Sequence, residues 1–98
     1  MQDDHDQKQL EEGLTLHYVP SQMHAAIRRY VLNHQPAGHF LTAVLKNDLH
    51  GALAHADTHN AICLTAWGHI IYHYVPSQCW GSPAKVSAWL AHSIAEDE

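Results

Sequence analysis

The segment from Cys79 to Lys85 combines residue types that can bind a small anion. Ser82 followed by proline is typical of a helix N-cap and the first helical position, so we expect a helix to begin there. Free backbone N–H groups at a helix start carry partial positive charge and attract anions. Lys85 adds a full charge, and Trp80 offers a flat face to a base or ring. The alternative is a capped helix whose tryptophan fills the core.

Two arginines of a separate helical segment, Arg28 and Arg29, can close such a site. A lysine in the first turn is mildly unfavourable to the helix dipole, which favours a functional reason for its presence. The predicted ligand-binding residues are Trp80, Ser82, Lys85, Arg28 and Arg29.

Two histidine pairs have the spacing at which a helix can bind zinc. His55 and His59, and likewise His69 and His73, are four positions apart and would lie one turn apart on a helix face. Each pair supplies only two ligands, whereas a closed zinc site usually needs four. We therefore predict no metal site and no cofactor, and we interpret the histidines as polar flanks of apolar helix faces. A histidine-dependent metal-binding or pH-responsive module remains an alternative.

Catalytic patterns are missing from the sequence. The serines and cysteines lie in no nucleophile-elbow or other activating motif, and no glycine-rich phosphate loop occurs. Between residues 13 and 95 the only acids are Asp48 and Asp57, so paired carboxylates are absent there. We predict a protein that is not an enzyme and has no catalytic residue.

The composition favours self-association over binding to nucleic acid or membrane. Of the 98 residues, those from 13 to 95 contain ten of the eleven histidines but only six formally charged side chains, namely Arg28, Arg29, Lys46, Asp48, Asp57 and Lys85. Ordinary soluble domains are about a quarter charged, so a surface this poor in charge suggests contacts between subunits, as in a homo-oligomer. The four bases are the few places where an anion can be held. They are too few for a nucleic-acid groove.

Other features concern the compartment. The longest apolar runs fall far short of the roughly 20 residues that span a bilayer, and the polar N-terminus does not look like a signal peptide. Cys63 and Cys79 are therefore expected to be free thiols in a reducing cytoplasm.

Apolar periodicity predicts an all-α fold, a compact bundle of about four helices with short loops. The expected helices cover residues 21–34, 40–53, 57–76 and 82–94, with a bend near Gly51 in the second and Asp57 or Thr58 capping the third. Residues 1–13 are expected to form a disordered acidic tail, 14–95 a single helical domain and 96–98 an acidic end. Residues 17–22 recur letter for letter as residues 73–78, as HYVPSQ. This repeat is either a duplicated half-site or one solution to helix entry used twice.

Three stretches resemble a group of small, largely uncharacterised proteins encoded by tailed bacteriophages and prophages. They are FLTAVLKNDL at 40–49, ADTHN at 56–60 and CWGSPAKVSAW at 79–89, within a likeness that covers roughly residues 20–90. His50, His55 and His73 stand where that group ordinarily has charged residues. The resemblance implies a phage accessory protein in the cytoplasm of the infected bacterial host. Such a protein would act by binding, either sequestering a nucleotide-derived immune signal between subunits or covering the surface of a host protein.

Overall fold

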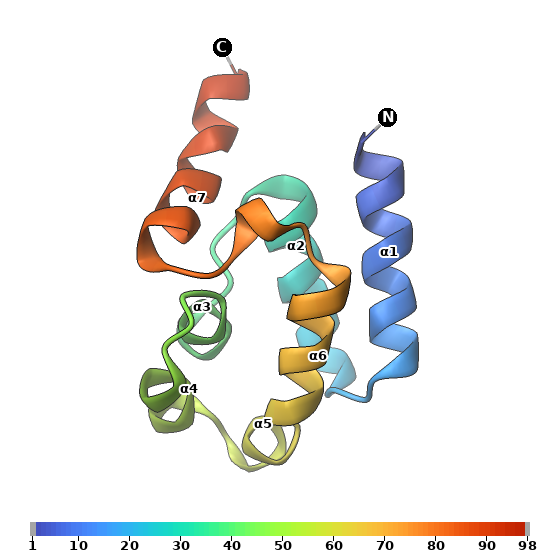
Figure 1. The fold of residues 1–98 in the computed structure, drawn as a ribbon, viewed down its shortest axis with the longest axis vertical. Helices are drawn as coiled ribbons and strands as arrows, with labels where there is room; N and C mark the ends of the chain where they lie inside the picture. Colours follow the sequence, from blue (N-terminus) through green and yellow to red (C-terminus); the bar gives the residue numbers. More distant parts are fainter. Residues whose placement is uncertain (1, 98) are drawn as a thin grey trace.

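The expected all-α fold is confirmed by a computed structural model, which describes residues 2–97 and, among them, the side chains of residues 5–91. The described residues form α-helices and two short 3-10 helices, with no strand. In chain order these elements are α1 (Gln2–Leu16), η1 (Ser21–Met23), α2 (His24–Asn33), α3 (His39–Leu45), α4 (Leu49–His55), α5 (Thr58–Ile62), α6 (Leu64–Tyr74), η2 (Ser77–Cys79) and α7 (Pro83–Asp97). Figure 1 shows them along the chain.

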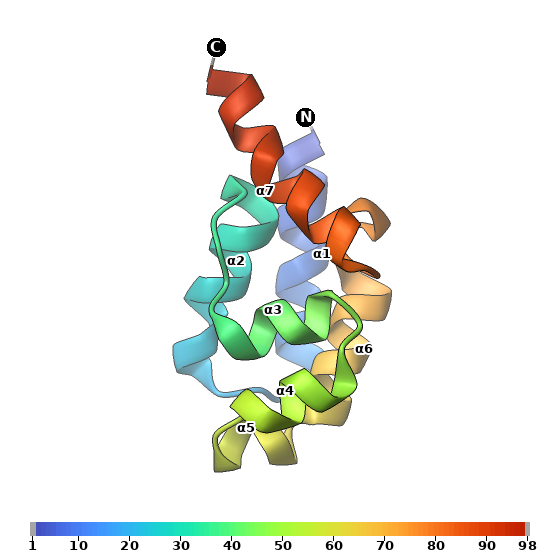
Figure 2. The ribbon, with the colours of Figure 1, turned by 90° about the vertical axis from the view of Figure 1, so that its left-hand side faces the viewer.

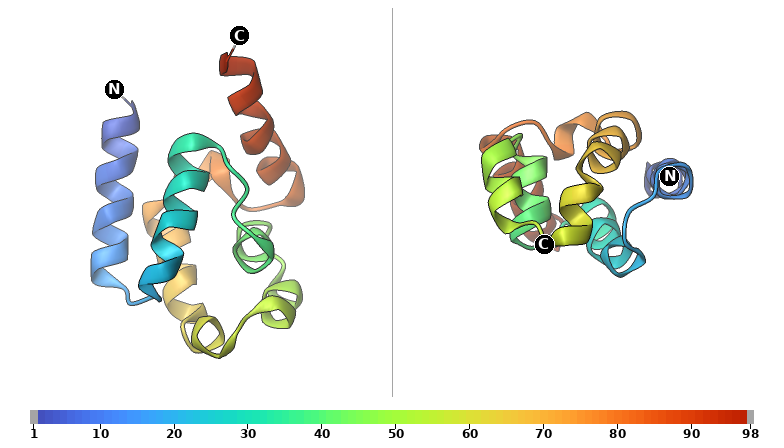
Figure 3. Two further views of the ribbon diagram at one scale, coloured as in Figure 1. Left: turned by 180° about the vertical axis from the view of Figure 1, so that it is seen from behind. Right: turned by 90° about the horizontal axis from the view of Figure 1, so that it is seen from below.

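The expected disordered tail is wrong, because residues 2–16 form helix α1, which packs along α6 and α2. Leu10 and Leu14, four positions apart, form a buried apolar stripe on this helix. Between them the backbone at Gly13 lies so close to Tyr74 that an added Cβ would come within 2.6 Å of the ring. The two leucines supply the apolar contact and Gly13 allows the close approach, so an otherwise acidic helix packs against the core. Figures 1 and 3 show α1 beside the rest of the fold.

The expected simple bundle of four helices is also wrong, because three of the expected helices are divided. The first begins as η1 and continues as α2. The second divides into α3 and α4 at Asn47, which adopts the left-handed conformation with φ 66° that asparagine tolerates better than most residues. Asp48 then caps α4 by accepting a hydrogen bond from the Gly51 N–H at 3.0 Å, so the break precedes the expected bend at that glycine. The third divides into α5 and α6 at Cys63.

The helices meet in one buried cluster, with α3 and α4 running across the direction of α1, α2 and α6 (Figure 2). Trp67 of α6 is fully buried, and its indole N–H donates to the side-chain oxygen of buried Asn60 at 3.0 Å. The Tyr30 hydroxyl donates to the Cys79 carbonyl at 2.6 Å, and the Trp89 indole N–H donates to the Tyr30 carbonyl at 2.8 Å. Tyr30 therefore joins α2 to both η2 and α7.

The two HYVPSQ copies share the local structure of their last four residues, whereas His73 and Tyr74 end α6 and His17 and Tyr18 follow the end of α1. In each copy the valine is buried and the proline is followed by a 3-10 turn. The Met23 N–H donates to the Pro20 carbonyl and the Cys79 N–H to the Pro76 carbonyl, both at 2.9 Å. The turn leads directly into α2 in the first copy, whereas in the second copy η2 ends at Cys79 and α7 begins only at Pro83.

Two further expectations concern the ends and the membrane. The side chains of the acidic C-terminal end, residues 96–98, lie outside the described residues. Within the part of the chain that is described, no helix has both the length and the apolar character needed to cross a membrane.

Candidate functional site

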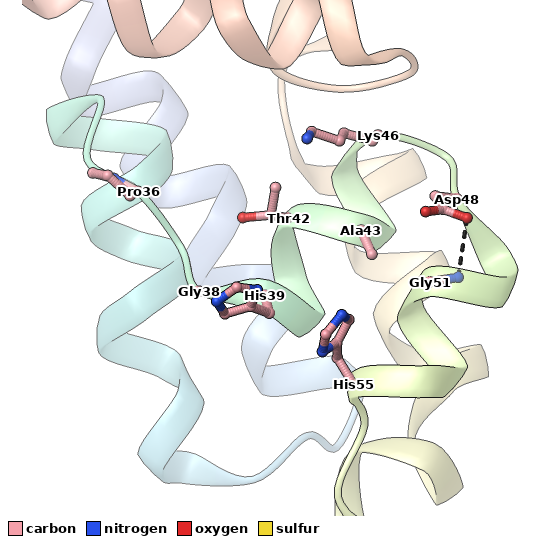
Figure 4. Close-up of a pocket in the computed structure, with 9 residues that line it drawn as sticks. All are labelled: Pro36, Gly38, His39, Thr42, Ala43, Lys46, Asp48, Gly51 and His55. Atoms are coloured by element: carbon pink, nitrogen blue, oxygen red, sulfur yellow. Dashed lines mark hydrogen bonds between the residues drawn. The ribbon is translucent and has the colours of Figure 1, made fainter.

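A cleft of about 460 Å³ lies between α3 and α4. One wall is formed by α3 and the residue after it, through the side chains of His39, Thr42 and Lys46. His55 of α4 lines the other wall (Figure 4). The first three are spaced i, i+3 and i+7, so helical geometry alone places them on one face. Phe40, Leu41 and Leu45 fill the opposite face of α3 and are buried. The polar face of a half-buried helix therefore becomes the wall of a cleft.

The two imidazoles that meet in this cleft come from different helices. The ring centroids of His39 and His55 lie 5.1 Å apart with 34° between the ring planes, and both side chains are exposed. Gly38 precedes them at the cleft edge with φ 86°, a conformation that favours glycine and turns the chain into α3.

The formal charges in the cleft lining are Lys46 and Asp48. The Asp48 carboxylate is already used to cap α4. Among the described residues Lys46 forms no ion pair, and its ammonium points to the same side of α3 as the Thr42 hydroxyl, away from Asp48 (Figure 4). The cleft therefore presents one uncommitted cation together with a hydroxyl and two imidazoles.

A second cleft of about 610 Å³ adjoins the first and shares Gly38, His39 and His55 with it. Its remaining lining is mainly apolar, from Met23, Ala26, Ala37, Phe40 and Leu41, with Asp57 and Asn60 as polar groups. The Asp57 carboxylate caps α5, confirming the expected cap, and the Asn60 oxygen accepts from Trp67. The imidazole pair thus stands between a lobe lined by Lys46 and Asp48 and a largely apolar one.

The predicted segment around Trp80 has the expected helix start. Ser82 caps α7 by accepting a hydrogen bond from the Lys85 N–H at 3.2 Å. The Lys85 ammonium donates to the Ser77 carbonyl at 3.4 Å, so this cation is turned back onto η2. Trp80 is half-buried, packs edge-on against Tyr72 at 5.8 Å, and its buried indole N–H has no partner among the described residues. Ser82 and Lys85 are therefore in contact, while Trp80 packs against α6.

The two predicted arginines do not join that segment through any hydrogen bond or ion pair between described residues. Arg28 binds both carboxylate oxygens of Glu11 on α1, at 2.6 and 2.8 Å. The hydrogen bonds and charge of Arg28 hold the pKa of the Glu11 carboxyl below its ordinary value. Arg29 is exposed on α2. Arg28 is thus paired with α1, and the predicted five-residue site stays a prediction.

The histidine pairs are arranged differently from the expectation. His55 ends α4 and His59 lies in α5, so this pair does not share a helix. His69 and His73 do share α6, where their rings stack at 5.8 Å, and His17 stacks on His69 at 5.2 Å. Within the described residues no group of three or more histidine, cysteine, aspartate or glutamate side chains has a geometry that could hold a metal ion.

Sequence reasoning missed the cleft between α3 and α4, although one signal was present. His39, Thr42 and Lys46 form a polar stripe at helical spacing, and Lys46 was already one of four candidate anion-binding bases. Nothing in the local sequence indicated that His55 would face this stripe.

Comparison of the chain with known protein families, with curated proteins and with solved structures gives no match.

Proposed function

We propose that this protein is a non-enzymatic binding protein that self-associates and sequesters a small anionic, nucleotide-derived signalling molecule. The observation that carries the proposal is that Lys46, Thr42, His39 and His55 line one cleft. An ammonium, a hydroxyl and imidazole N–H groups can hold a phosphate through hydrogen bonds, and those to the charged groups are the stronger ones.

The adjoining lobe supports a ligand with both an anionic and a ring part. A phosphate near Lys46 would leave the rest of such a ligand to extend past the imidazole pair into the mainly apolar lobe. Heterocyclic bases stack on aromatic faces, and His39 and His55 are exposed at the junction. A nucleotide combines these two parts in one molecule.

Binding without chemistry agrees with the state of the thiols and of the carboxylate in the cleft. Asp48 is held as a helix cap. Cys63 and Cys79 are buried free thiols, and burial, with a smaller contribution from the charge of Asp6, raises the pKa of Cys79 to about 12. A thiol that stays protonated at neutral pH is a poor nucleophile.

The resemblance to phage and prophage proteins supplies the biological setting of the proposal. A phage accessory protein in the cytoplasm of an infected bacterium would gain from removing a nucleotide-derived defence signal. The segment of Trp80, Ser82 and Lys85, with Arg28 or Arg29 from a neighbouring subunit, is the second place in this chain where that ligand can bind.

A protein-interaction inhibitor that binds a host protein is the alternative function. The observation that favours it is a group of large apolar side chains left in contact with solvent, including Ile62 at 77% and Tyr18 at 73% exposure. Exposed apolar side chains of this size are common in protein-binding surfaces when they are contiguous.

The test measures the binding of cyclic nucleotides, ADP-ribose and inorganic phosphate by calorimetry and thermal shift. Lys46→Ala is expected to weaken binding of the preferred ligand about tenfold or more, because a hydrogen bond to a charged group contributes about 1.5–3 kcal/mol. Lys8→Ala is the matched control, because Lys8 is exposed on α1 and lines neither cleft, and it should bind as the wild type does. Binding that is lost in Lys85→Ala and kept in Lys46→Ala would assign the ligand to the Trp80 segment instead.

If no member of the panel binds, the sequestration proposal is wrong. A pull-down from host lysate with the wild type and an Ile62→Glu variant then tests the alternative. A host protein retained by the wild type and lost by the variant would support the inhibitor function.

A further inference from the structure

One face of α6 carries both a protruding ring and a bare stretch of backbone. Leu64, Gly68 and Tyr72 are spaced at i, i+4 and i+8, so they lie in a row along this face. Tyr72 is 68% exposed, and Gly68 is exposed with no atom within 4 Å of the position that a Cβ would take. One helical turn, about 6 Å, separates the ring from the gap.

The gap at Gly68 opens into a groove between α6 and the α3–α4 pair. This groove has a volume of about 250 Å³ and is lined mainly by apolar side chains, among them Val44, Leu49, Ala52 and Leu64. A cavity of roughly 150 Å³ with apolar walls accommodates benzene. The groove is therefore large enough for an aromatic side chain, and it is separate in its lining from the two imidazole-lined clefts apart from Asp48.

We propose that a second copy of this chain occupies the groove through a twofold-symmetric contact between the two α6 helices. An antiparallel crossing centred near residue 70 places Tyr72 of each copy opposite Gly68 of the other. The contact is then self-complementary, as a twofold interface must be. Each ring enters the neighbouring groove, and the absent side chain at Gly68 lets the two helix backbones approach closely.

The charge distribution of this face fits a second copy. Helix α6 contains no aspartate, glutamate, lysine or arginine, so two copies can meet there without opposing like charges. The one formal charge in the groove lining, on Asp48, accepts the hydrogen bond that caps α4. A strongly charged partner would find no fixed charge on α6 to pair with, whereas an identical neutral face is electrostatically matched.

The tyrosines alone would not make a stable interface. An aromatic side chain buries about 150–250 Å², whereas a specific interface buries about 1,200–2,000 Å² in total. Leu49 in the groove lining and Leu53, one turn further along α4, are exposed and add apolar area that twofold symmetry counts twice. Figure 1 shows α4 and α6 on the two sides of this region.

The experiment measures the oligomeric state of the full chain by light scattering and sedimentation equilibrium over a range of concentrations. The wild type is expected to be dimeric. Gly68→Leu should fill the groove and raise the dimer dissociation constant about 30-fold or more, the effect of losing an interface hot spot. The Gly68→Leu monomer should unfold at a temperature no lower than the wild-type monomer does. No atom obstructs a side chain at residue 68, and leucine favours a helix more than glycine does.

Tyr72→Ala is the second variant and should also dissociate the dimer. Tyr18→Ala is its matched control, since that tyrosine is similarly exposed, at 73% against 68%, but lies outside α6, and it should leave the dimer intact. Circular dichroism of each variant checks that the fold is kept.

The inference specifies the self-association in the proposed function, and its failure is distinguishable from failure of ligand binding. A wild-type dimer that persists in folded Gly68→Leu and Tyr72→Ala protein overturns this interface but not self-association. A wild type that is monomeric at every concentration overturns both, while the Lys46 binding measurement stands on its own.

Discussion

Replacing Tyr30 by phenylalanine isolates the hydrogen bond that ties α2 to η2. The side chain is 1% exposed, and its hydroxyl donates to the Cys79 carbonyl at 2.6 Å. Phenylalanine keeps the ring in the core but leaves that carbonyl without this donor. A buried polar group that loses its partner costs about 1–3 kcal/mol, a large part of the about 5–15 kcal/mol that stabilises a typical domain. In a domain of this size each kcal/mol corresponds to about 4–8 °C in Tm.

The same substitution should change how stability depends on alkaline pH. Burial raises the pKa of Tyr30 above its ordinary value of 10.0, so the folded protein keeps a proton that the unfolded chain releases. The contribution of this raised pKa to the free energy of unfolding is fully present below pH 10. It is lost as the pH rises above 10, at about 1.4 kcal/mol per pH unit. Burial also raises the pKa of Cys79, from 9.0 to about 12. The stability that Cys79 contributes therefore begins to be lost at pH 9, one pH unit below the onset for Tyr30. In Tyr30→Phe the free energy of unfolding should still fall with pH because of Cys79, but it should not fall more steeply above pH 10.

Urea denaturation followed by circular dichroism at pH 7 and at several alkaline pH values measures both effects. Tyr18→Phe is the matched control, because that tyrosine is exposed, and its free energy of unfolding should stay within about 0.5 kcal/mol of the wild type. Equal stability of Tyr30→Phe and wild type at pH 7 would refute the assigned role of the hydroxyl. An unchanged slope above pH 10 would refute the assignment of that titration to Tyr30.

Two other substitutions test how α1 is attached. Glu11→Gln should lower the free energy of unfolding at pH 7 by about 0.2–1 kcal/mol, because the pair with Arg28 is 41% and 37% exposed and screened by solvent. Because the pKa of Glu11 is lowered in the fold, the wild type should be more stable than Glu11→Gln above pH 4.5, and this difference in stability should disappear as the pH falls below 4.5. A difference that persists in acid would contradict the pairing. Gly13→Ala should lower Tm, by overpacking of about 1–3 kcal/mol against Tyr74, although alanine is the better helix former. A raised Tm would show that α1 does not lie this close to α6.

Much of the secondary structure was predictable because it depends on neighbours in sequence. Apolar spacing indicated helices in the regions of α2, α3, α6 and α7, and the side chains of Asp57 and Ser82 cap helices as their positions suggested. The breaks at Asn47 and Cys63 were not predictable from periodicity, because the apolar pattern continues through both.

Helix α1 was missed for a different reason. Leu10 and Leu14 form a stripe too short to stand out among acids, and what buries them is contact with elements remote in sequence. The close approach of Gly13 to Tyr74 joins positions that no local pattern connects. A helix whose stability comes from tertiary packing leaves a weak signature in its own segment.

The sequence by itself determined the helical class of this protein, its scarcity of fixed charge and the small set of bases that can hold an anion. Only the tertiary structure decided which of those bases are committed: Arg28 to Glu11 and Lys85 to the Ser77 carbonyl, while Lys46 lines the same cleft as two imidazoles. The physical reason is that helical repeat geometry relates residues three or four apart. The meeting of His39 with His55, or of a groove with the open side of Gly68, depends on how separate helices pack.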